Sequence, residues 1–366
     1  MEKKYRAMEK LEMNSAFWKN KDVLITGHTG FKGTWLSLML NELGANISGI
    51  SLKPEKNKIF FNSIKKKIIL KESIYGDIRQ KEFLEKSIKK IRPKIIFHLA
   101  AQPLVLNSYK DPVGTYETNI IGMINLLETV RKLKSVKSLI NVTSDKCYHN
   151  KNKKNKFRES DPLGGFDPYS SSKACSEIIT TAYYNSFLKD RLGLATVRAG
   201  NIIGGGDWSD NRLIPDVVRS LKANRNITIR YPLAVRPWQH VIDPLIGYIN
   251  LMEMLYEFPL KYSSSWNFGP KSSSEVNVKK IVNDFLKLWN SNIKIKVEKN
   301  DKLYESSYLA LNTSKVSKSL KWKPEINYLE SLKMTAKWYE AWIDNVDLYE
   351  FSREQINQLF KKKYVA

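Results

Sequence analysis

DVLITGHTGFKGTWLSLML, from Asp22 to Leu40, is the stretch that decides the fold. An apolar run of strand length, DVLIT, ends at three glycines in G-x-x-G-x-x-G spacing, and apolar residues at helical spacing follow. Such glycines let the chain turn tightly and let backbone N–H groups approach a pyrophosphate, which the start of the following helix stabilises. The stretch predicts a strand, a phosphate-binding loop and a helix opening at Thr34, although a glycine-rich turn without function has the same pattern.

Outward from this stretch, apolar runs of strand length alternate with segments of helical period. The strand-like runs NISGIS, KIIFHLA, SLINVTS and LATVRAG are continuous in apolar residues. Strands buried on both faces have this composition, so we expect an α/β fold, a doubly wound parallel sheet with helices on both sides. After Gly200 the alternation breaks into a Gly- and Pro-rich segment with isolated strands such as ITIR and WNFG. We predict an N-terminal extension (1–16), a dinucleotide-binding Rossmann domain (17–200) and a smaller α+β substrate domain (201–366), partly interleaved with the first.

Two further loops of the first domain are expected to contact the dinucleotide. GDI follows the third predicted strand, where its acid could bind adenine, and the small residues of FHLAAQ form a turn close to which a ribose could lie. The predicted cofactor contacts outside the catalytic group are Gly27, Thr29, Gly30, Phe31, Gly33, Asp77, Ile78, Leu99, Ala100 and Ala101. We interpret His28 and His98 as packing residues.

The composition excludes several functional classes. The 366 residues are 42% hydrophobic, and no apolar run approaches the roughly 18 residues that cross a bilayer. The N-terminal segment lacks the apolar stretch of a signal peptide, so we expect a cytoplasmic protein without a membrane partner. The net charge of +24 comes mostly from dispersed lysines, which argues against nucleic-acid binding. Cys147, Cys175 and four scattered histidines predict neither a disulfide framework nor a metal site.

Two groups of polar residues follow the fifth predicted strand. NVTSDKCY places Ser144, Asp145 and Lys146 directly after it. An isolated Asp-Lys dipeptide is most often a solvated surface pair, and the sequence on either side of this one argues against that explanation. Tyr169 and Lys173 of YSSSK lie one helical turn apart, so they share a face of the next helix. Spacing alone does not make these residues catalytic, because YxxxK often occurs by chance.

The glycine spacing, the HLAA turn and the YSSSK motif resemble the extended short-chain dehydrogenase/reductase superfamily. Within it, a hydroxyl residue followed by Asp is typical of nucleotide-sugar 4,6-dehydratases, which usually continue with Glu. Asp-Lys instead resembles the branch acting on CDP-glucose, as do FWKNKDVLITGHTGFKGTWL, TSDKCY, DPLGGFDPYSSSKACSE, VRAGNIIGGGDWSDNRLIPD and RPWQHVIDPLIGY. The resemblance covers Phe17 to about Pro324. It implies NAD, a homodimer, and a hydro-lyase that makes CDP-4-keto-6-deoxyglucose early in the synthesis of deoxysugars for surface polysaccharides.

The resemblance also implies catalytic roles for Ser144, Asp145, Lys146, Tyr169 and Lys173. A phenol has a pKa near 10, so Tyr169 as a base at neutral pH needs about three units of depression, roughly 4 kcal/mol. One cation about 5 Å away supplies about 3 kcal/mol at an effective dielectric of ~20, so Lys173 and an oxidised nicotinamide together would suffice. Oxidation of sugar carbon 4 acidifies the hydrogen on carbon 5, and its removal expels the hydroxyl from carbon 6. This elimination needs a base and an acid, and hydride then returns to carbon 6.

The two elimination roles stay open. In an Asp-Lys pair each partner favours the charged form of the other, so the shared proton cannot be assigned. The family implies Asp145 as the acid and Lys146 as the base, and the reverse is physically as reasonable. The implied substrate-binding residues are Asn201, Arg212, Arg236 and Glu305. Arginine suits a diphosphate because its planar fork donates two hydrogen bonds, although Arg212 is equally explained as a surface residue.

Several points depart from the family pattern or stay undecided. The second strand ends in GISLKP, without the acid that binds the ribose hydroxyls of NAD, and Lys53 could tolerate a 2′-phosphate. NAD is still expected from the family. The alternative functions are a dehydratase of another nucleotide hexose and a non-catalytic dinucleotide-binding protein. We expect the homodimer to pair through helices beginning near Asp111 and Tyr169, with a stripe of Ile120, Ile124 and Leu127 that could equally face the parent sheet.

Overall fold

The computed structural model describes residues 14–151, 155–298 and 306–364. Two sequence predictions therefore lie wholly or mostly outside the described residues: the substrate contact of Glu305 and the N-terminal extension. No helix within the described ranges is long and apolar enough to span a bilayer.

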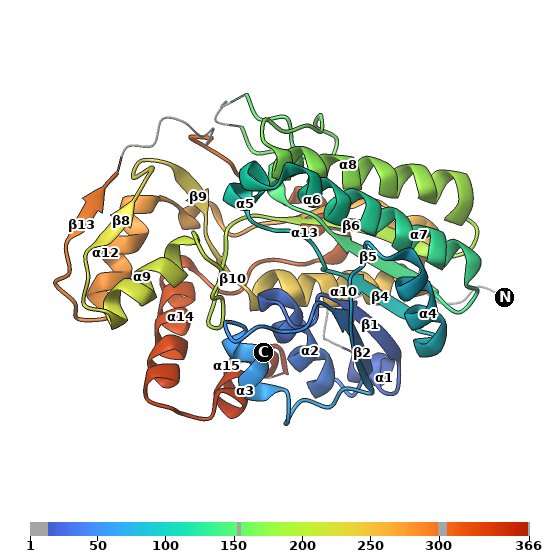
Figure 1. Ribbon diagram of the computed structural model, residues 1–366, viewed down its shortest axis with the longest axis horizontal. Coiled ribbons are helices and arrows are strands. Elements are labelled where there is room, and N and C mark those ends of the chain that lie inside the picture. Colours follow the sequence, from blue (N-terminus) through green and yellow to red (C-terminus); the bar gives the residue numbers. More distant parts are fainter. Residues whose placement is uncertain (1–13, 152–154, 299–305, 365–366) are drawn as a thin grey trace.

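A seven-stranded sheet forms the centre of the molecule (Figure 1). Its strands are β1 Asp22–Thr26, β2 Asn46–Ser51, β3 Glu72–Tyr75, β4 Ile95–His98, β5 Ser138–Val142, β6 Gly193–Ala199 and β11 Ser265–Phe268. They lie in the order β11-β6-β5-β4-β1-β2-β3, and all neighbours run parallel. The chain order reverses between β1 and β4, and doubly wound sheets bind ligands at the carboxyl ends of the strands at this point.

Helices cover both faces of the sheet (Figure 1). One face carries α4 Lys81–Ile91, α5 Val105–Lys110, α6 Pro112–Tyr116, η1 Glu117–Ile121, α7 Gly122–Lys132, α8 Pro168–Tyr183 and η3 Tyr184–Leu188. The other carries α1 Ser15–Trp18, α2 Phe31–Glu42, α3 Ile59–Ile64, α10 Ile242–Glu257, α11 Pro259–Tyr262 and α15 Leu348–Tyr364. The predicted fold class is confirmed, because this is a doubly wound α/β sheet.

The continuous apolar runs are explained by burial on both faces. In β1, Val23 and Ile25 belong to one core cluster and Leu24 to the other. Successive side chains of a strand point to opposite faces, so a sheet covered on both sides needs an apolar residue at every position.

A smaller lobe stands at the carboxyl edge of the sheet, on the left of Figure 1. Its helices and turns are α9 Leu213–Lys222, η4 Ser272–Ser274, α12 Val278–Leu288 and α14 Tyr328–Ile343. The helix α13 Ser314–Leu320 lies instead against β11 of the main sheet. The short strands of the lobe are β7 Ile202–Ile203, β8 Ile227–Ile229, β9 Val235–Pro237, β10 Gln239–His240, β12 Glu275–Asn277 and β13 Ile295–Val297. They pair two by two, β7 with β10, β8 with β13, and β9 with β12.

Two predictions about element placement were wrong. The WNFG segment was expected in the substrate lobe, yet β11 pairs with β6 at the edge of the main sheet. Trp266 and Phe268 are buried there in the core beneath α10, which no local pattern of an isolated strand could indicate. The helix after the glycine loop also begins at Phe31, with Gly30 as its N-cap, and not at Thr34.

The last helix returns to the first domain. α15 contacts α2 and α3. Arg353 of α15 donates to Glu42 at the end of α2, with 2.7 Å between Nε and Oε1, and Asp347 forms an ion pair with Lys67. The chain therefore crosses between the two lobes more than once.

Candidate active site

The glycine loop has a geometry that only glycine can adopt at two positions. Gly27 has a φ of +77°, and a Cβ there would lie 2.8 Å from the backbone nitrogen of Ala100. A Cβ on Gly33 would lie 2.1 Å from the carbonyl oxygen of Gly27. The loops after β1 and β4 thus approach each other at the switch point, and α2 starts directly behind them. This arrangement fits the pyrophosphate of a dinucleotide.

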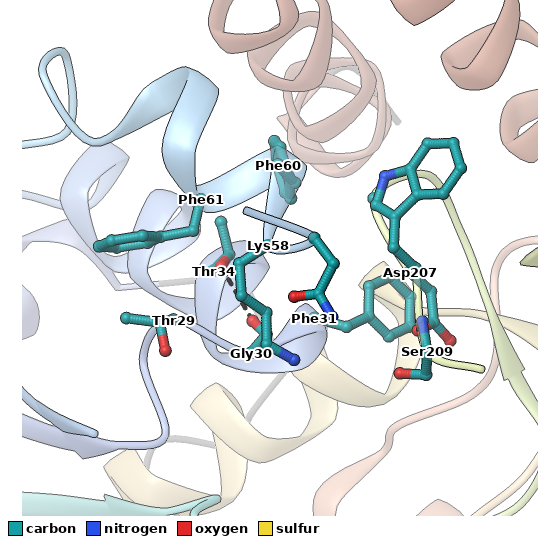
Figure 2. Close-up of a pocket in the computed structure, with 12 residues that line it drawn as sticks. Thr29, Gly30, Phe31, Thr34, Lys58, Phe60, Phe61, Asp207 and Ser209 are labelled. Atoms are coloured by element: carbon teal, nitrogen blue, oxygen red, sulfur yellow. Dashed lines mark hydrogen bonds between the residues drawn. The ribbon is translucent and has the colours of Figure 1, made fainter. Parts of the chain in front are cut away.

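A lysine that the sequence reasoning missed lies beside this loop. Figure 2 shows Lys58, the N-cap of α3, extending toward Gly30 at the start of α2. Together with Thr29, Gly30 and Phe31 it lines a small pocket closed on the far side by residues 206–209. An ammonium group here adds positive potential to the N-terminus of a twelve-residue helix.

The predicted adenine and ribose loops lie at the expected strand ends. Asp77 follows β3, and its carboxylate accepts from the backbone and the guanidinium of Arg79 at 2.7–2.9 Å. Burial raises the pKa of Asp77, but these bonds outweigh it and lower the pKa. Ile78 packs against Gly122, and residues 99–101 follow β4.

His28 and His98 are packing residues, as predicted. Burial lowers the pKa of His28 to about 4 and that of His98 to about 3, so both rings are neutral at physiological pH. His28 contacts Ser73 at 2.8 Å, and the Nδ1 atom of His98 lies 2.7 Å from the Thr26 hydroxyl.

A cleft of about 560 Å³ opens between the lobes at the carboxyl ends of β5 and β6. It brings together most of the predicted catalytic and substrate-binding residues, and it adds a lysine from the glycine loop. These lining residues are Lys32, Ser144, Asp145, Lys146, Tyr169, Asn201, Arg212 and Arg236. The cleft continues between α9 and β8 toward Arg230 and Tyr231.

Tyr169 and Lys173 occupy the first turns of α8. The helix starts at Pro168, and its N-cap Asp167 accepts from the backbone nitrogen of Ser170 at 2.9 Å. The Lys173 ammonium lies under Tyr169 in the helix and donates to the carbonyl oxygen of Val142 at 3.3 Å. Burial lowers the pKa of Lys173 to about 8.

The predicted depression of the Tyr169 pKa is absent from the protein on its own. Burial raises this pKa to about 12, and the Ser144 hydroxyl and the Arg212 charge only partly offset it. The prediction counted the charges of Lys173 and of an oxidised nicotinamide, and it omitted the cost of burying a phenolate, which opposes ionisation. A lowered pKa therefore requires charge from a bound group in addition to the protein.

Ser144 and Asp145 form a turn directly after β5. The Ser144 Oγ accepts from the Lys146 backbone nitrogen at 3.2 Å and donates to Asp145 Oδ1 at 3.1 Å. Asp145 is 4% exposed, so it is not part of a solvated surface pair. Burial raises its pKa, opposed by Lys146 first and then by Ser144, Arg236 and Lys32. Charge pairing was expected to decide this site, and burial outweighs it.

The other Asp145 oxygen, Oδ2, faces the loop that follows β6. It has no hydrogen-bond partner among the described residues. A Cβ on Gly200 would lie 2.8 Å from this oxygen and 2.9 Å from the Pro237 Cγ. Glycine at position 200 therefore gives the buried carboxylate its room.

Lys32 is a partly buried lysine of the cleft that the sequence reasoning did not find. Burial, followed by the charges of Arg212 and Lys173, lowers its pKa to about 7, while Asp145 and Asp207 raise it. The signal was present in GFKG, where a charged residue interrupts an otherwise apolar first helical turn. The glycine loop thus sends a titratable amine into the cleft beside Asp145.

The predicted diphosphate ligands lie on the substrate side. Arg212 donates to Asp207 at 2.7 Å, so it is a cleft residue held by an ion pair and not a free surface arginine. Arg236 is buried and donates to the carbonyl oxygen of Ser306 at 2.6 Å. Asn201 lies at the end of β6 beside them.

Comparison with known proteins identifies the family. The profile of the GDP-mannose 4,6 dehydratase family matches residues 24–335. The CDP-glucose 4,6-dehydratase of Salmonella typhimurium is 44% identical over 347 residues, which is 93% of this chain and 96% of that protein. The chain belongs to the GDP-mannose 4,6 dehydratase family. A dTDP-D-glucose 4,6-dehydratase of Dictyostelium discoideum is 28% identical, covering 90% of this chain and 85% of that protein.

A solved structure of a 4,6-dehydratase has the same fold. The dTDP-glucose 4,6-dehydratase of Bacillus anthracis, crystallised in complex with NAD, aligns with a TM-score of 0.73 and 25% identity. The alignment covers 89% of this chain and 99% of that one. The resemblance to nucleotide-sugar 4,6-dehydratases drawn from the sequence is confirmed.

Proposed function

We propose that the protein is an NAD-dependent hydro-lyase that converts CDP-glucose to CDP-4-keto-6-deoxyglucose and water. The observation that carries this proposal is the burial of Asp145, beside Lys146, in the cleft that Tyr169 also lines. An enzyme that only moved hydride would need Tyr169 and Lys173. Elimination also needs an acid and a base, and Asp145 and Lys146 supply them.

In the proposed reaction, Tyr169 accepts the proton of the hydroxyl on carbon 4, assisted by Ser144 and the charge of Lys173. NAD, when bound, would supply the acceptor for the hydride of carbon 4 and the donor of hydride for carbon 6. The raised pKa of Asp145 keeps a proton on this carboxyl more readily than on an exposed one, which favours Asp145 as the acid for the leaving hydroxyl. Lys146 is then the base for carbon 5.

The proposed cofactor is NAD, held by the glycine loop, Asp77, Ile78 and residues 99–101. Gly27 and Gly33 leave room for a pyrophosphate against the start of α2. β2 ends in Ser51 and not in an acid, so the preference over NADP rests on the relative from Bacillus anthracis, which was crystallised with NAD.

We propose that Asn201, Arg212 and Arg236 bind the nucleotide diphosphate. All three line the cleft, and two guanidinium groups complement two phosphates. CDP-glucose is favoured over other nucleotide hexoses because the relative from Salmonella typhimurium shares 44% identity across nearly the whole chain.

We also propose a cytoplasmic homodimer that pairs through α6, α7 and α8. Apolar side chains are exposed on this layer at Val113, Tyr116, Ile121 and Ile178. Within the predicted stripe, Ile120 and Ile124 are partly buried, whereas Leu127 is fully buried in the core of its own subunit and does not belong to the stripe. Light scattering at micromolar concentration tests the proposal, and a monomer mass would refute it.

The function is tested by incubating the purified protein and NAD with a panel of nucleotide hexoses. A 4-keto sugar develops an ultraviolet band in alkali, and we expect it with CDP-glucose. If the band appears only with a different nucleotide hexose, that sugar nucleotide is the substrate in place of CDP-glucose. If the protein binds NAD but forms no product from any nucleotide hexose of the panel, it is a non-catalytic binding protein.

A further inference from the structure

Beneath the cleft lies a buried ion pair that the proposed mechanism does not use. Glu177 of α8 is 1% exposed and Arg198 of β6 is 2% exposed. Two parallel contacts of 2.8 Å join the Arg198 Nε and Nη2 atoms to the two carboxylate oxygens. Replacing a buried pair by apolar residues is often neutral or stabilising, so stability alone is a poor explanation of its presence.

The carboxylate of this pair holds the residue that precedes Ser144. Glu177 accepts hydrogen bonds of 2.5 Å from the hydroxyls of Thr143 and Thr196. A third hydroxyl, that of Ser265, donates at 3.3 Å. Burial raises the pKa of Glu177, and the bonds from Arg198 and the threonines outweigh it. Glu177 is therefore ionised, and it anchors the first residue of the catalytic turn, which comprises residues 143–148.

The guanidinium of the pair holds the other end of the turn. Arg198 Nη1 donates to the Tyr148 hydroxyl at 2.6 Å, and this hydroxyl donates to Asn267 Oδ1 at 2.7 Å. The guanidinium also lies over the Tyr148 ring, 4.7 Å from its centroid. Tyr148 comes two residues after Lys146, so one ion pair fixes both ends of residues 143–148.

The Glu177–Arg198 pair also acts on Lys173, the lysine one helical turn after Tyr169. Glu177 lies one turn after Lys173 on the same helix, and its charge is the largest influence that opposes burial and raises the Lys173 pKa. The other titratable groups facing Lys173 are Cys147 of the catalytic turn, Lys32 of α2 and His98 of β4. Only Glu177 among them is ionised and negative, so it sustains the positive charge of Lys173.

We propose that Glu177 and Arg198 are positioning residues of the dehydration reaction, which hold Ser144, Asp145 and Lys146 in register with Tyr169. The inference rests on the proposed function. Reacting groups must lie within fractions of an ångström of their working positions, and a misplacement of about 1 Å costs roughly 100-fold. A turn of six residues with both ends tied to one rigid pair meets this demand.

The test uses variants that keep the ion pair and remove one link to the turn. Thr143→Val and Tyr148→Phe each delete a hydroxyl, and Thr143→Ser restores the first one. Thr180→Val is the matched control, because Thr180 is a buried threonine of α8 that bonds Asn141 and Ser176 and not Glu177. For each holoenzyme, kcat, the KM for CDP-glucose, NAD affinity and the thermal midpoint are measured.

We expect Thr143→Val and Tyr148→Phe to lower kcat by roughly 10- to 100-fold, with KM and NAD affinity unchanged within about twofold. Thr143→Ser should recover most of the rate, and Thr180→Val should lose stability without losing kcat. Glu177→Gln, where it folds, should move the high-pH limb of the rate profile down by roughly one pH unit, because Lys173 then loses its proton more easily.

Loss of stability with native kcat in both hydroxyl-deletion variants, as in Thr180→Val, would overturn the inference. An unshifted pH profile in folded Glu177→Gln would overturn the part concerning Lys173. A wild-type enzyme that dehydrates no nucleotide hexose would instead overturn the proposed function, so the two failures are distinguishable.

Discussion

Gly200→Ala is the most direct test of the buried carboxylate. The added methyl group would lie 2.8 Å from Asp145 Oδ2, about 0.6 Å closer than the 3.4 Å at which ordinary contacts begin. Pro237 Cγ, at 2.9 Å, blocks the methyl group on its other side. The carboxylate has to move, and we expect kcat to fall by roughly 10- to 100-fold, because a displacement of about 1 Å can cost that much. Overpacking should also cost about 1–3 kcal/mol of stability.

The assay for Gly200→Ala separates oxidation from elimination. In a single turnover the absorbance of reduced nicotinamide should accumulate, because Tyr169 still removes the proton at carbon 4 while Asp145 no longer protonates the leaving hydroxyl. Gly269→Ala is the control, since its nearest neighbour, the Thr313 Cγ2, would be at an ordinary 3.4 Å. A folded Gly200→Ala protein that forms the 4-keto product at the native rate would refute the assigned role of Asp145.

Four further outcomes are expected. Tyr169→Phe should show no reduced cofactor in a single turnover, and detectable reduction would contradict its role as a base. Replacing both Asp145 and Lys146 by Ala should trap reduced cofactor and a 4-keto hexose that keeps its hydroxyl on carbon 6. Each single change should slow dehydration by roughly 10²- to 10⁴-fold, and the double change should slow it by less than the product of the two. Dehydration at a near-native rate would exclude the pair from the chemistry. Gly27→Ala should weaken NAD binding measured by calorimetry, since it combines a φ of +77° with a 2.8 Å clash, and native affinity would contradict the proposed pyrophosphate site. Burial lowers the pKa of Lys173 from 10.5 to about 8, so the cost of burying its charge is full below pH 8 and vanishes as the pH rises through 10.5. Lys173→Met should therefore raise the free energy of unfolding at pH 7 by up to about 3 kcal/mol, and this gain should be lost as the pH rises through 10.5. A difference in stability that does not change with pH would contradict the lowered pKa.

Sequence reasoning could group the candidate site residues because the carboxyl ends of parallel strands meet at one edge of a sheet. Asp145, after β5, and Tyr169, at the start of the next helix, could be brought together from strand order alone, and both line the cleft. Lys58 was missed because nothing in its spacing shows where a long flexible side chain points. Lys32 was missed although its position in GFKG marks it as an unusual charged residue, because the sequence does not show that its side chain enters the cleft.

The errors share one physical cause, which is burial by segments distant in the chain. Burial raises the pKa of Tyr169 to about 12 in the protein on its own, and the sequence reasoning did not count this cost, because desolvation depends on neighbours that a local motif does not contain. β11 was assigned to the wrong lobe for the same reason, since its place in the sheet is set by pairing with β6 and by packing of Phe268 against Tyr248 of α10. Local sequence patterns predict helices and strands, whereas packing between distant segments decides which side chains are ionised and where an edge strand joins the sheet.

The placement of β11 and α15 has a consequence for how the chain is synthesised. Residues 22–199 contain six of the seven strands, but the outer edge of β6 stays unpaired until Ser265–Phe268 has left the ribosome. The contact of Arg353 with Glu42 forms only when the last helix is made. Unpaired edges and uncovered apolar faces make nascent chains prone to aggregation. A chain truncated at residue 200 should therefore be insoluble, and the nascent cofactor domain should depend on chaperones until translation ends.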